Sequence, residues 1–289
     1  LDQGRPNFGR LVGAPIQEDL TFSTLDPSLS VSYTAGNHLV YASWARAHRS
    51  GGFNQDDPSF ANLGGGLTFD TEVANSYELG AKGAFLDRAL NLSVAVFFVK
   101  YDNLLYNDAI QANDPRGQGF QLLFVANGGA AEVRGAEADM TFRVRDVASM
   151  GGDLILNAGV AYNNTEYTET IPRSAARVGF SISQTPKWDY RIGGTYRQPI
   201  AKDLNLFLNT NYSSEIGGVD SVSLQNPRAT VVRWDGQAGL EGQNGDHTWA
   251  FTAFVNNITD RSYDLRRDGT GSAKADPRTW GVRLTIRGS

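Results

Sequence analysis

The stretch LNLSVAVF, residues 90–97, alternates bulky apolar side chains with smaller or more polar ones. A period of two is typical of a β-strand whose two faces meet different surroundings. One face would carry Leu90, Leu92, Val94 and Val96, and the other Asn91, Ser93, Ala95 and Phe97. A soluble sandwich would bury the apolar face in a core, whereas a membrane barrel would turn it toward lipid and its polar face toward an aqueous lumen. The rest of the chain decides between these two settings.

The composition of the 289-residue chain fits an all-β protein, with 32 glycines and 11% aromatic residues. No apolar run of about 18 residues is present, so we expect no transmembrane helix. A membrane barrel stays possible, because half of each of its strands is polar and the mean hydropathy remains low. The absence of cysteine excludes disulfides, thiolate zinc sites and iron–sulfur clusters. The net charge of −5 gives no reason to expect nucleic acid as a partner.

Alternation recurs along the whole chain and predicts eleven strands. We place them at residues 27–35, 38–49, 72–85, 89–107, 121–145, 153–166, 186–198, 204–217, 231–242, 246–257 and 278–287. Short turns rich in Gly, Asn and Asp alternate with long connections. The long connections lie at about residues 50–71, 108–120, 167–185, 218–230 and 258–277. This alternation puts all long loops at one end of an antiparallel sheet, as in bacterial outer-membrane barrels.

Strand length and strand number both favour a membrane barrel. Most predicted strands exceed the 5–6 residues usual in soluble sheets, and about 9–11 tilted residues span a bilayer. Aromatic residues near strand ends would suit the girdles at the membrane interfaces: Tyr101, Tyr106, Tyr162, Trp188 and Trp280. Single-chain bacterial barrels have even strand numbers, so eleven strands predict part of a larger barrel. A soluble eleven-stranded can would need a central helix, and no helical period is present.

Five segments match, in order and spacing across residues 24–287, the motifs of one known family. They are YASWARAHRSGGFN (41–54), TEVANSYELGAKGAFLDRALNLSVAVFFVKYDNL (71–104), NGGAAEVRGAEADM (127–140), VNNITDRSYD (255–264) and DPRTWGVRLTIR (276–287). Together they resemble the C-terminal half of TonB-dependent receptors, the 22-stranded outer-membrane transporters whose lumen is plugged. Two features depart from the family: the plug, TonB box and first half of the barrel are absent, and the chain ends in IRGS rather than in an aromatic residue.

The resemblance implies a fold, a location and a function. Residues 27–289 would form the C-terminal part of the barrel, about half of its 22 strands, and residues 1–26 an extracellular loop or preceding segment. The protein would lie in the outer membrane of a Gram-negative bacterium, in contact with its lipid. It would bind a ferric siderophore or a similar large, scarce nutrient and import it with energy from the TonB complex, coupled through the missing plug. A passive porin-like or structural barrel is the alternative, and a soluble all-β binding module is a third.

The sequence does not indicate catalysis. The three histidines give no zinc-ligand spacing, and no nucleophile elbow or phosphate loop is present, so we expect neither an enzyme nor a cofactor or metal site. On the loop side, arginine forks suit carboxylate or catecholate chelates, and aromatic rings suit flat organic ligands. The candidate ligand contacts are Arg49, Phe53, Asn54, Arg116, Arg173 and Arg228, with Asn113 and Arg266 on the same side.

In the family, other polar residues are architectural. We expect lumen or turn hydrogen bonds from Glu78, Lys82, Glu137, Asn257 and Asp260. If the chain is part of a membrane barrel, Val94 in the stretch 90–97 faces lipid and Ser93 faces the lumen or the plug. Phe97 is then a misfit, a large apolar side chain on the polar face that we expect to pack against the plug.

Overall fold

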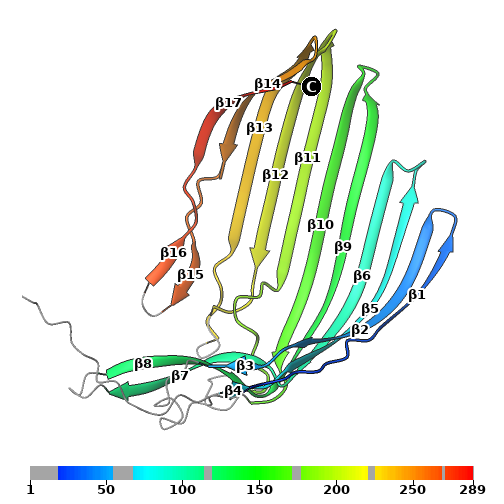
Figure 1. Cartoon of the computed structure of the whole chain (residues 1–289). Helices are drawn as coiled ribbons and strands as arrows, with labels where there is room; N and C mark the ends of the chain where they lie inside the picture. Colours follow the sequence, from blue (N-terminus) through cyan, green and yellow to red (C-terminus); the bar gives the residue numbers. More distant parts are fainter. Residues whose placement is uncertain are drawn as a thin grey trace, which may run out of the picture.

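The computed structural model describes residues 19–54, 68–113, 119–170, 177–220, 225–268 and 271–288. Eleven long strands form one antiparallel sheet in the order β1-β2-β5-β6-β9-β10-β11-β12-β13-β14-β17. The sheet is curved and open, with β1 and β17 at its edges (Figure 1). The prediction of an antiparallel all-β sheet of eleven strands is confirmed. The described part of the chain contains no helix long and apolar enough to cross a membrane.

The long strands lie where the alternating pattern placed them. They are β1 (Ser28–Ala35), β2 (His38–Arg49), β5 (Glu72–Phe85), β6 (Leu90–Asp102), β9 (Ala130–Val147), β10 (Gly152–Tyr167), β11 (Trp188–Ala201), β12 (Leu204–Ile216), β13 (Val231–Asn244), β14 (His247–Asn256) and β17 (Thr279–Gly288). Five short turns join them pairwise at one end of the sheet (Figure 1). The opposite end, where the long connections lie, is called the loop end below.

The connection predicted as a loop at residues 108–120 belongs instead to a β-hairpin. Its strands are β7 (Leu105–Asn113) and β8 (Gly119–Asn127), and the predicted strands 89–107 and 121–145 were therefore too long. Asn103 and Gly129 have positive φ angles of 57° and 71° and separate the hairpin from β6 and β9. A left-handed residue redirects the chain while leaving the side-chain alternation on either side intact, so alternation alone did not reveal the break.

Two shorter hairpins also lie at the loop end. They pair β3 (Gly52–Phe53) with β4 (Thr68–Phe69), and β15 (Asp264–Asp268) with β16 (Gly271–Lys274). Figure 1 shows them, with β7 and β8, away from the short turns. The long connections predicted at residues 50–71, 108–120 and 258–277 therefore contain hairpins rather than plain loops.

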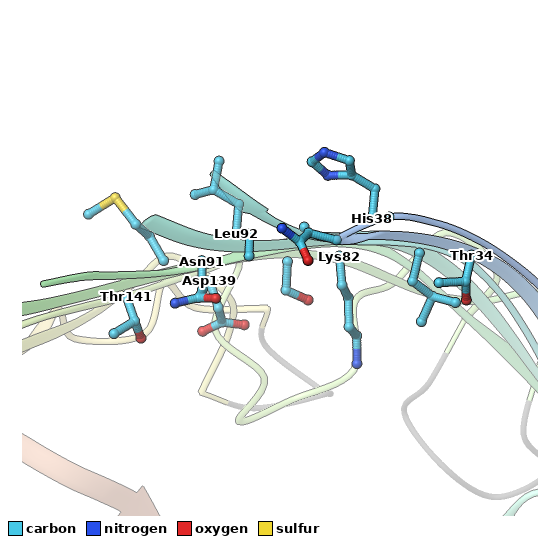
Figure 2. A pocket seen from close by; sticks show the side chains of 14 residues that line it. Thr34, His38, Lys82, Asn91, Leu92, Asp139 and Thr141 are labelled. Carbon is cyan, nitrogen blue, oxygen red and sulfur yellow. The ribbon is translucent and has the colours of Figure 1, made fainter. Parts of the chain in front are cut away.

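Cross-strand pairing gives the sheet one apolar and one polar face. Val94 lies opposite Ala81 and Ala138, whereas Ser93 lies opposite Lys82 and Asp139. Figure 2 shows the same division, with Leu92 on one side of the sheet and Lys82 and Asp139 on the other. The face with Val94 is called the apolar face and the face with Ser93 the polar face. Val94 is 50% exposed, so a row of bulky apolar side chains has no partner within the described residues.

The register also decides where the aromatic residues lie. All five tryptophans are on the apolar face: Trp44, Trp188, Trp234, Trp249 and Trp280. Tyr162 is opposite Trp188 and shares this face. Tyr101, four residues after Phe97, lies on the polar face, and Tyr106 packs against the buried pair Ala131 and Tyr167. The expectation that Tyr101 and Tyr106 belong to a lipid-facing girdle was therefore wrong.

Phe97 has a partner within the sheet. Its ring covers Gly135, directly opposite on β9, where an added Cβ would collide with the ring. The same arrangement occurs three more times on the polar face, with Tyr41 over Gly80, Phe207 over Gly239 and Phe254 over Gly281. An aromatic ring over a glycine shields backbone that has no side chain of its own and adds a fixed register contact. The large side chain on the polar face thus has a structural reason that does not require a plug.

Candidate functional site

A row of charged side chains crosses the polar face. Lys82, Ser93, Asp139, Gly159 and Arg191 lie opposite one another on consecutive strands from β5 to β11. Long charged residues thus alternate with Ser or Gly, which leaves room between them. Around Lys82 and Asp139 the surface is hollowed by about 590 Å³ (Figure 2). The polar face therefore offers a hydrated, charged wall rather than a closed pocket.

Hydrogen bonds and ion pairs tie the polar face together. Tyr41 donates to the carboxylate of Glu78, in agreement with the architectural role predicted for Glu78. The Lys82 ammonium lies 5.5 Å from the Tyr41 ring centroid. Arg191 Nε pairs with Asp189 Oδ1 at 3.2 Å. These contacts fix long side chains on a surface that faces away from the apolar residues.

At the loop end, side-chain amides attach the β7–β8 hairpin to the sheet. Asn54 donates through Nδ2 to Val125 O and accepts from Val125 N, both at 2.8 Å, as a neighbouring strand would. Asn127 donates to Asp70 O at 2.8 Å, and Glu72 Oε2 accepts from Leu105 N at 2.7 Å. The base of the hairpin is therefore fixed by polar contacts.

Three segments of the loop end are hydrogen-bonded to one another. Gln225 accepts from Ser181 N at 2.9 Å and donates to Ser181 O at 3.2 Å. Gln184 N donates to Val219 O at 2.8 Å, and its side chain donates to Asp220 O at the same distance. The segments around residues 181–184, 217–220 and 225–228 thus hold one another in place.

Arg228 belongs to the third of these segments, and its backbone N–H donates to Gly218 O at 3.1 Å. Its side chain is 10% exposed, and its Nη2 pairs with Glu215 Oε2 at 2.6 Å. Within the described residues its Nε and Nη1 have no hydrogen-bond acceptor. Glu215 lies directly opposite Asp189, so the guanidinium reduces the repulsion between two facing carboxylates. The structure thus makes Arg228 an internal ion-pair partner of the sheet.

The connection after β14 is a tight polar turn. Asn257, 7% exposed, donates to Arg261 O at 3.0 Å and to Asp276 O at 3.1 Å, and accepts from Arg261 N at 3.1 Å. Asp260 Oδ1 accepts from Arg278 N at 3.1 Å. The turn hydrogen bonds predicted for Asn257 and Asp260 are present. Burial raises the pKa of the neighbouring Tyr263 above its usual value.

The predicted ligand contacts differ in accessibility. Arg49 is exposed at the loop end of β2, and Phe53 is 46% exposed in β3. Asn54 and Arg228 are engaged in the contacts described above. Arg116 and Arg173 lie outside the described residues, whereas Asn113 and Arg266 belong to β7 and β15. All of these remain predictions as ligand contacts.

Sequence patterns missed several residues that organise the loop end. Glu72, Asn127, Glu215 and Gln225 each join segments far apart in the chain. Asn127 falls inside the predicted strand 121–145, and no local pattern identifies the distant partners of these four residues. Among the residues that the structure describes, no group of three or more His, Cys, Asp or Glu side chains could hold a metal ion.

Comparisons with known proteins agree with this geometry. Residues 3–258 match the family described as TonB dependent receptor-like, beta-barrel. The ferric-pyoverdine M114 receptor PbuA of Pseudomonas sp. (strain M114) is 29% identical over 224 residues, which cover 74% of this chain and 24% of that protein. The ferric-pyoverdine 358 receptor of Pseudomonas putida is 26% identical over 220 residues, covering 76% and 24%. The chain spans about a quarter of the length of these relatives.

Solved structures share the fold. The ferric preacinetobactin receptor BauA from Acinetobacter baumannii superposes with a TM-score of 0.68 at 19% identity, over 90% of this chain and 36% of that chain. The ferric yersiniabactin uptake receptor FyuA from Yersinia pestis gives 0.64 at 18% identity, over 90% and 36%. At these identities the similarity establishes the architecture of the sheet.

Proposed function

Because the chain belongs to the TonB-dependent receptor family, we propose that it forms part of an outer-membrane transporter that binds a ferric siderophore and imports it with TonB-coupled energy. The family comprises receptors rather than enzymes, and its members lie in the outer membrane of Gram-negative bacteria. The observation that carries the proposal is the match of residues 3–258 to the family, on a sheet with one lipid-compatible face and one charged face.

The proposed division of the chain follows the sheet. Residues 27–289 form the C-terminal part of the barrel, and residues 1–26 a loop or preceding segment on the extracellular side. The loop end then faces the outside, the short turns face the periplasm, and the apolar face meets outer-membrane lipid. The plug that couples to TonB belongs to a part of the receptor outside these 289 residues.

The proposed ligand is a ferric siderophore of the pyoverdine kind, since two relatives are named for ferric pyoverdines. Such chelates present carboxylate and other oxygen groups that guanidinium side chains hold through two parallel hydrogen bonds. Arg49 and Phe53, both exposed at the loop end, are the described residues best placed to make the first contact. Arg116 and Arg173 remain candidates from the sequence.

Uptake of radioactive iron tests the proposal. The gene that encodes the chain is deleted, and cells are given ⁵⁵Fe–pyoverdine under iron limitation, with and without a protonophore. We expect uptake to fall on deletion, to return on complementation, and to stop with the protonophore. Uptake that persists with the protonophore would favour the passive barrel, and uptake unaffected by deletion would refute a role in importing this ligand.

A further inference from the structure

The long connections at the loop end contact one another in sequence order. They are the first connection (residues 50–71), the second (103–129), the third (168–187) and the fourth (217–230). Figure 1 shows the hairpins of the first two, β3–β4 and β7–β8, at the same end of the sheet. The contacts between successive connections decide whether each can move by itself.

The first and second connections are joined by two asparagines in a reciprocal arrangement. Asn54, directly after β3, bonds to both the N–H and the C=O of Val125 in β8. Asn127, the last residue of β8, in turn accepts from the N–H of Asp70, directly after β4, and donates to its C=O at 2.8 Å. Each hairpin therefore supplies one amide that replaces a strand neighbour of the other. If either hairpin moved away, both pairs of hydrogen bonds would break.

The second and third connections meet in a small apolar core on the polar face. At its centre are Ala131 and Tyr167, which lie opposite each other at the loop ends of β9 and β10 and are 0% and 7% exposed. Tyr167 N donates to Phe180 O at 2.9 Å, which places the third connection against this pair. The apolar side chains packed against the pair come from both connections: Leu104 and Tyr106 from the second, Phe180 and Ile182 from the third. Withdrawal of either connection would expose this core to water.

The third and fourth connections are joined by side-chain amides, as the first two are. Gln225 bonds to both the N–H and the C=O of Ser181. Gln184 returns the contact, through its N–H to Val219 O and through its side chain to Asp220 O. Contacts between described residues thus run without a break from the first connection to the fourth.

Shared contacts of this kind make separate opening costly. If the third connection opened alone, it would expose Tyr167 and leave Ser181 and Gln225 without each other's hydrogen bonds. The second and fourth connections would both lose a partner, so their own opening would become easier. Segments that depend on one another in this way open together, as one cooperative unit.

The fifth connection, residues 257–278, provides a contrast. Asn257 N donates to Asp235 Oδ1 at 2.8 Å and Ile258 N donates to Trp234 O at 2.7 Å, both on β13. These two amides are tied to a long strand of the sheet, and their hydrogen exchange therefore reports on the sheet itself.

We propose that the first four connections open and become ordered as one cooperative unit, so that a ligand held at Arg49 and Phe53 also stabilises the fourth connection around Arg228. The unit itself rests on the contacts above, whereas its response to a ligand rests on the function proposed above. A contact that orders one connection leaves less ordering for the next contact to impose, so ligand contacts made by different connections strengthen one another. Ligand affinity then belongs to the unit as a whole rather than to any single loop.

Hydrogen exchange of the whole receptor in detergent tests the unit at single amides. Ile182→Ala removes a partly buried side chain of the third connection from the apolar core. Exchange should rise about tenfold at Val125 N in the second connection and at Arg228 N in the fourth, because the unit opens more often. Exchange at Asn257 N and Ile258 N should stay unchanged, which shows that the sheet is intact.

Val178→Ala is the matched control, since Val178 lies in the same connection as Ile182 but is 59% exposed. It should leave exchange unchanged at all of these amides. Asn54→Ala tests the unit from its other end and should raise exchange at Ser181 N, whose acceptor is Gln225. If Ile182→Ala and Asn54→Ala leave exchange in the other connections unchanged, the connections open independently and the proposal is wrong.

Addition of ferric pyoverdine to the unmodified receptor tests the response to a ligand. We expect slower exchange at Arg228 N as well as around Phe53. Slower exchange around Phe53 alone would overturn the coupling. No change at any amide would refute this chelate as the ligand, and with it the proposed function, while the two variants still decide whether the connections form one unit.

Discussion

On the polar face, each of four aromatic rings covers one glycine, and the contact between Phe97 and Gly135 leaves no space for a side chain at Gly135. An added Cβ would collide with the Phe97 ring and lie 2.5 Å from the backbone oxygen of Tyr162. Since a backbone atom cannot swing aside, the strand itself would have to move. Glycine is therefore required at position 135 by both neighbouring strands, β6 through the Phe97 ring and β10 through the Tyr162 backbone.

Gly135→Ala should lower the free energy of unfolding by about 1–3 kcal/mol, the usual cost of overpacking. Gly194→Ala is the control, because its nearest neighbour, Leu156 Cδ2, lies at an ordinary 3.4 Å. Urea unfolding of the detergent-folded protein measures both. A Gly135→Ala protein as stable as the control would show that β9 and β10 have room to separate.

Val94 and Ser93 are adjacent in sequence but lie on opposite faces. Val94→Lys should impair assembly into the membrane, since a lysine facing lipid near the midplane costs about 2–4 kcal/mol. Ser93→Lys should be tolerated, because it joins a row that already holds Lys82 and Asp139. Heat-modifiable migration of the folded protein in outer-membrane fractions gives the comparison. Equal behaviour of the two variants would mean that the faces are assigned wrongly.

Among the elements, the β7–β8 hairpin is held at Val125 by the side chain of Asn54, which takes the place of a neighbouring strand. Asn54→Ala removes both hydrogen bonds to Val125 and leaves its half-buried backbone groups without these partners. Hydrogen exchange at Val125 should show an opening free energy lower by about 1–3 kcal/mol. Asn91→Ala, which loses one long bond of 3.4 Å to Arg88 O, should leave exchange in β8 unchanged. Unchanged exchange in Asn54→Ala would mean that other contacts hold the hairpin.

The sequence predicted the long strands well because each alternates over many residues, and the five short turns because Gly, Asn and Asp mark them. It failed where the chain bends without losing alternation. Asn103 and Gly129 redirect the backbone with positive φ angles, and the alternation of side chains does not distinguish this from a straight strand. Tyr106 was misplaced for the same reason, since its surroundings depend on that bend. Tyr101 lies within β6, before the bend, and its place on the polar face follows from the same alternation as that of Phe97.

For the whole molecule, the position of every tryptophan on the apolar face makes fluorescence a test of orientation. In bilayers, brominated lipid should quench the emission strongly, whereas iodide in the aqueous phase should quench it weakly. Trp188 lies at the loop end and Trp249 toward the short turns. With lipid brominated near the outer-leaflet headgroups, Trp188→Phe should therefore reduce the quenching more than Trp249→Phe does. Strong quenching by iodide alone would place the apolar face in water, and weak quenching by both agents would place it in a sealed core.

The candidate site was less predictable than the fold. Arginines and aromatic residues could be assigned to the loop side from their position between strands, as Arg49 and Phe53 illustrate. Pairing between distant segments could not be predicted: Arg228 was a plausible ligand contact in sequence, yet its side chain is 10% exposed and pairs with Glu215, which faces Asp189 on the neighbouring strand. Such contacts depend on register and loop packing, which no local pattern specifies.

The direction of the edge strands limits how this sheet can be completed. Every neighbouring pair is antiparallel and the strand number is odd, so β1 and β17 both run from the loop end to the short turns (Figure 1). If two copies were related by rotation about the barrel axis, β17 of one copy would lie parallel to β1 of the other. If one copy were inverted so that these edge strands paired antiparallel, the loop ends of the two copies would lie on opposite sides of the membrane. A closed antiparallel barrel with all loop ends on one side therefore needs a second set of strands that differs from this sheet and has an odd number of strands. A second copy of this sheet cannot supply that set.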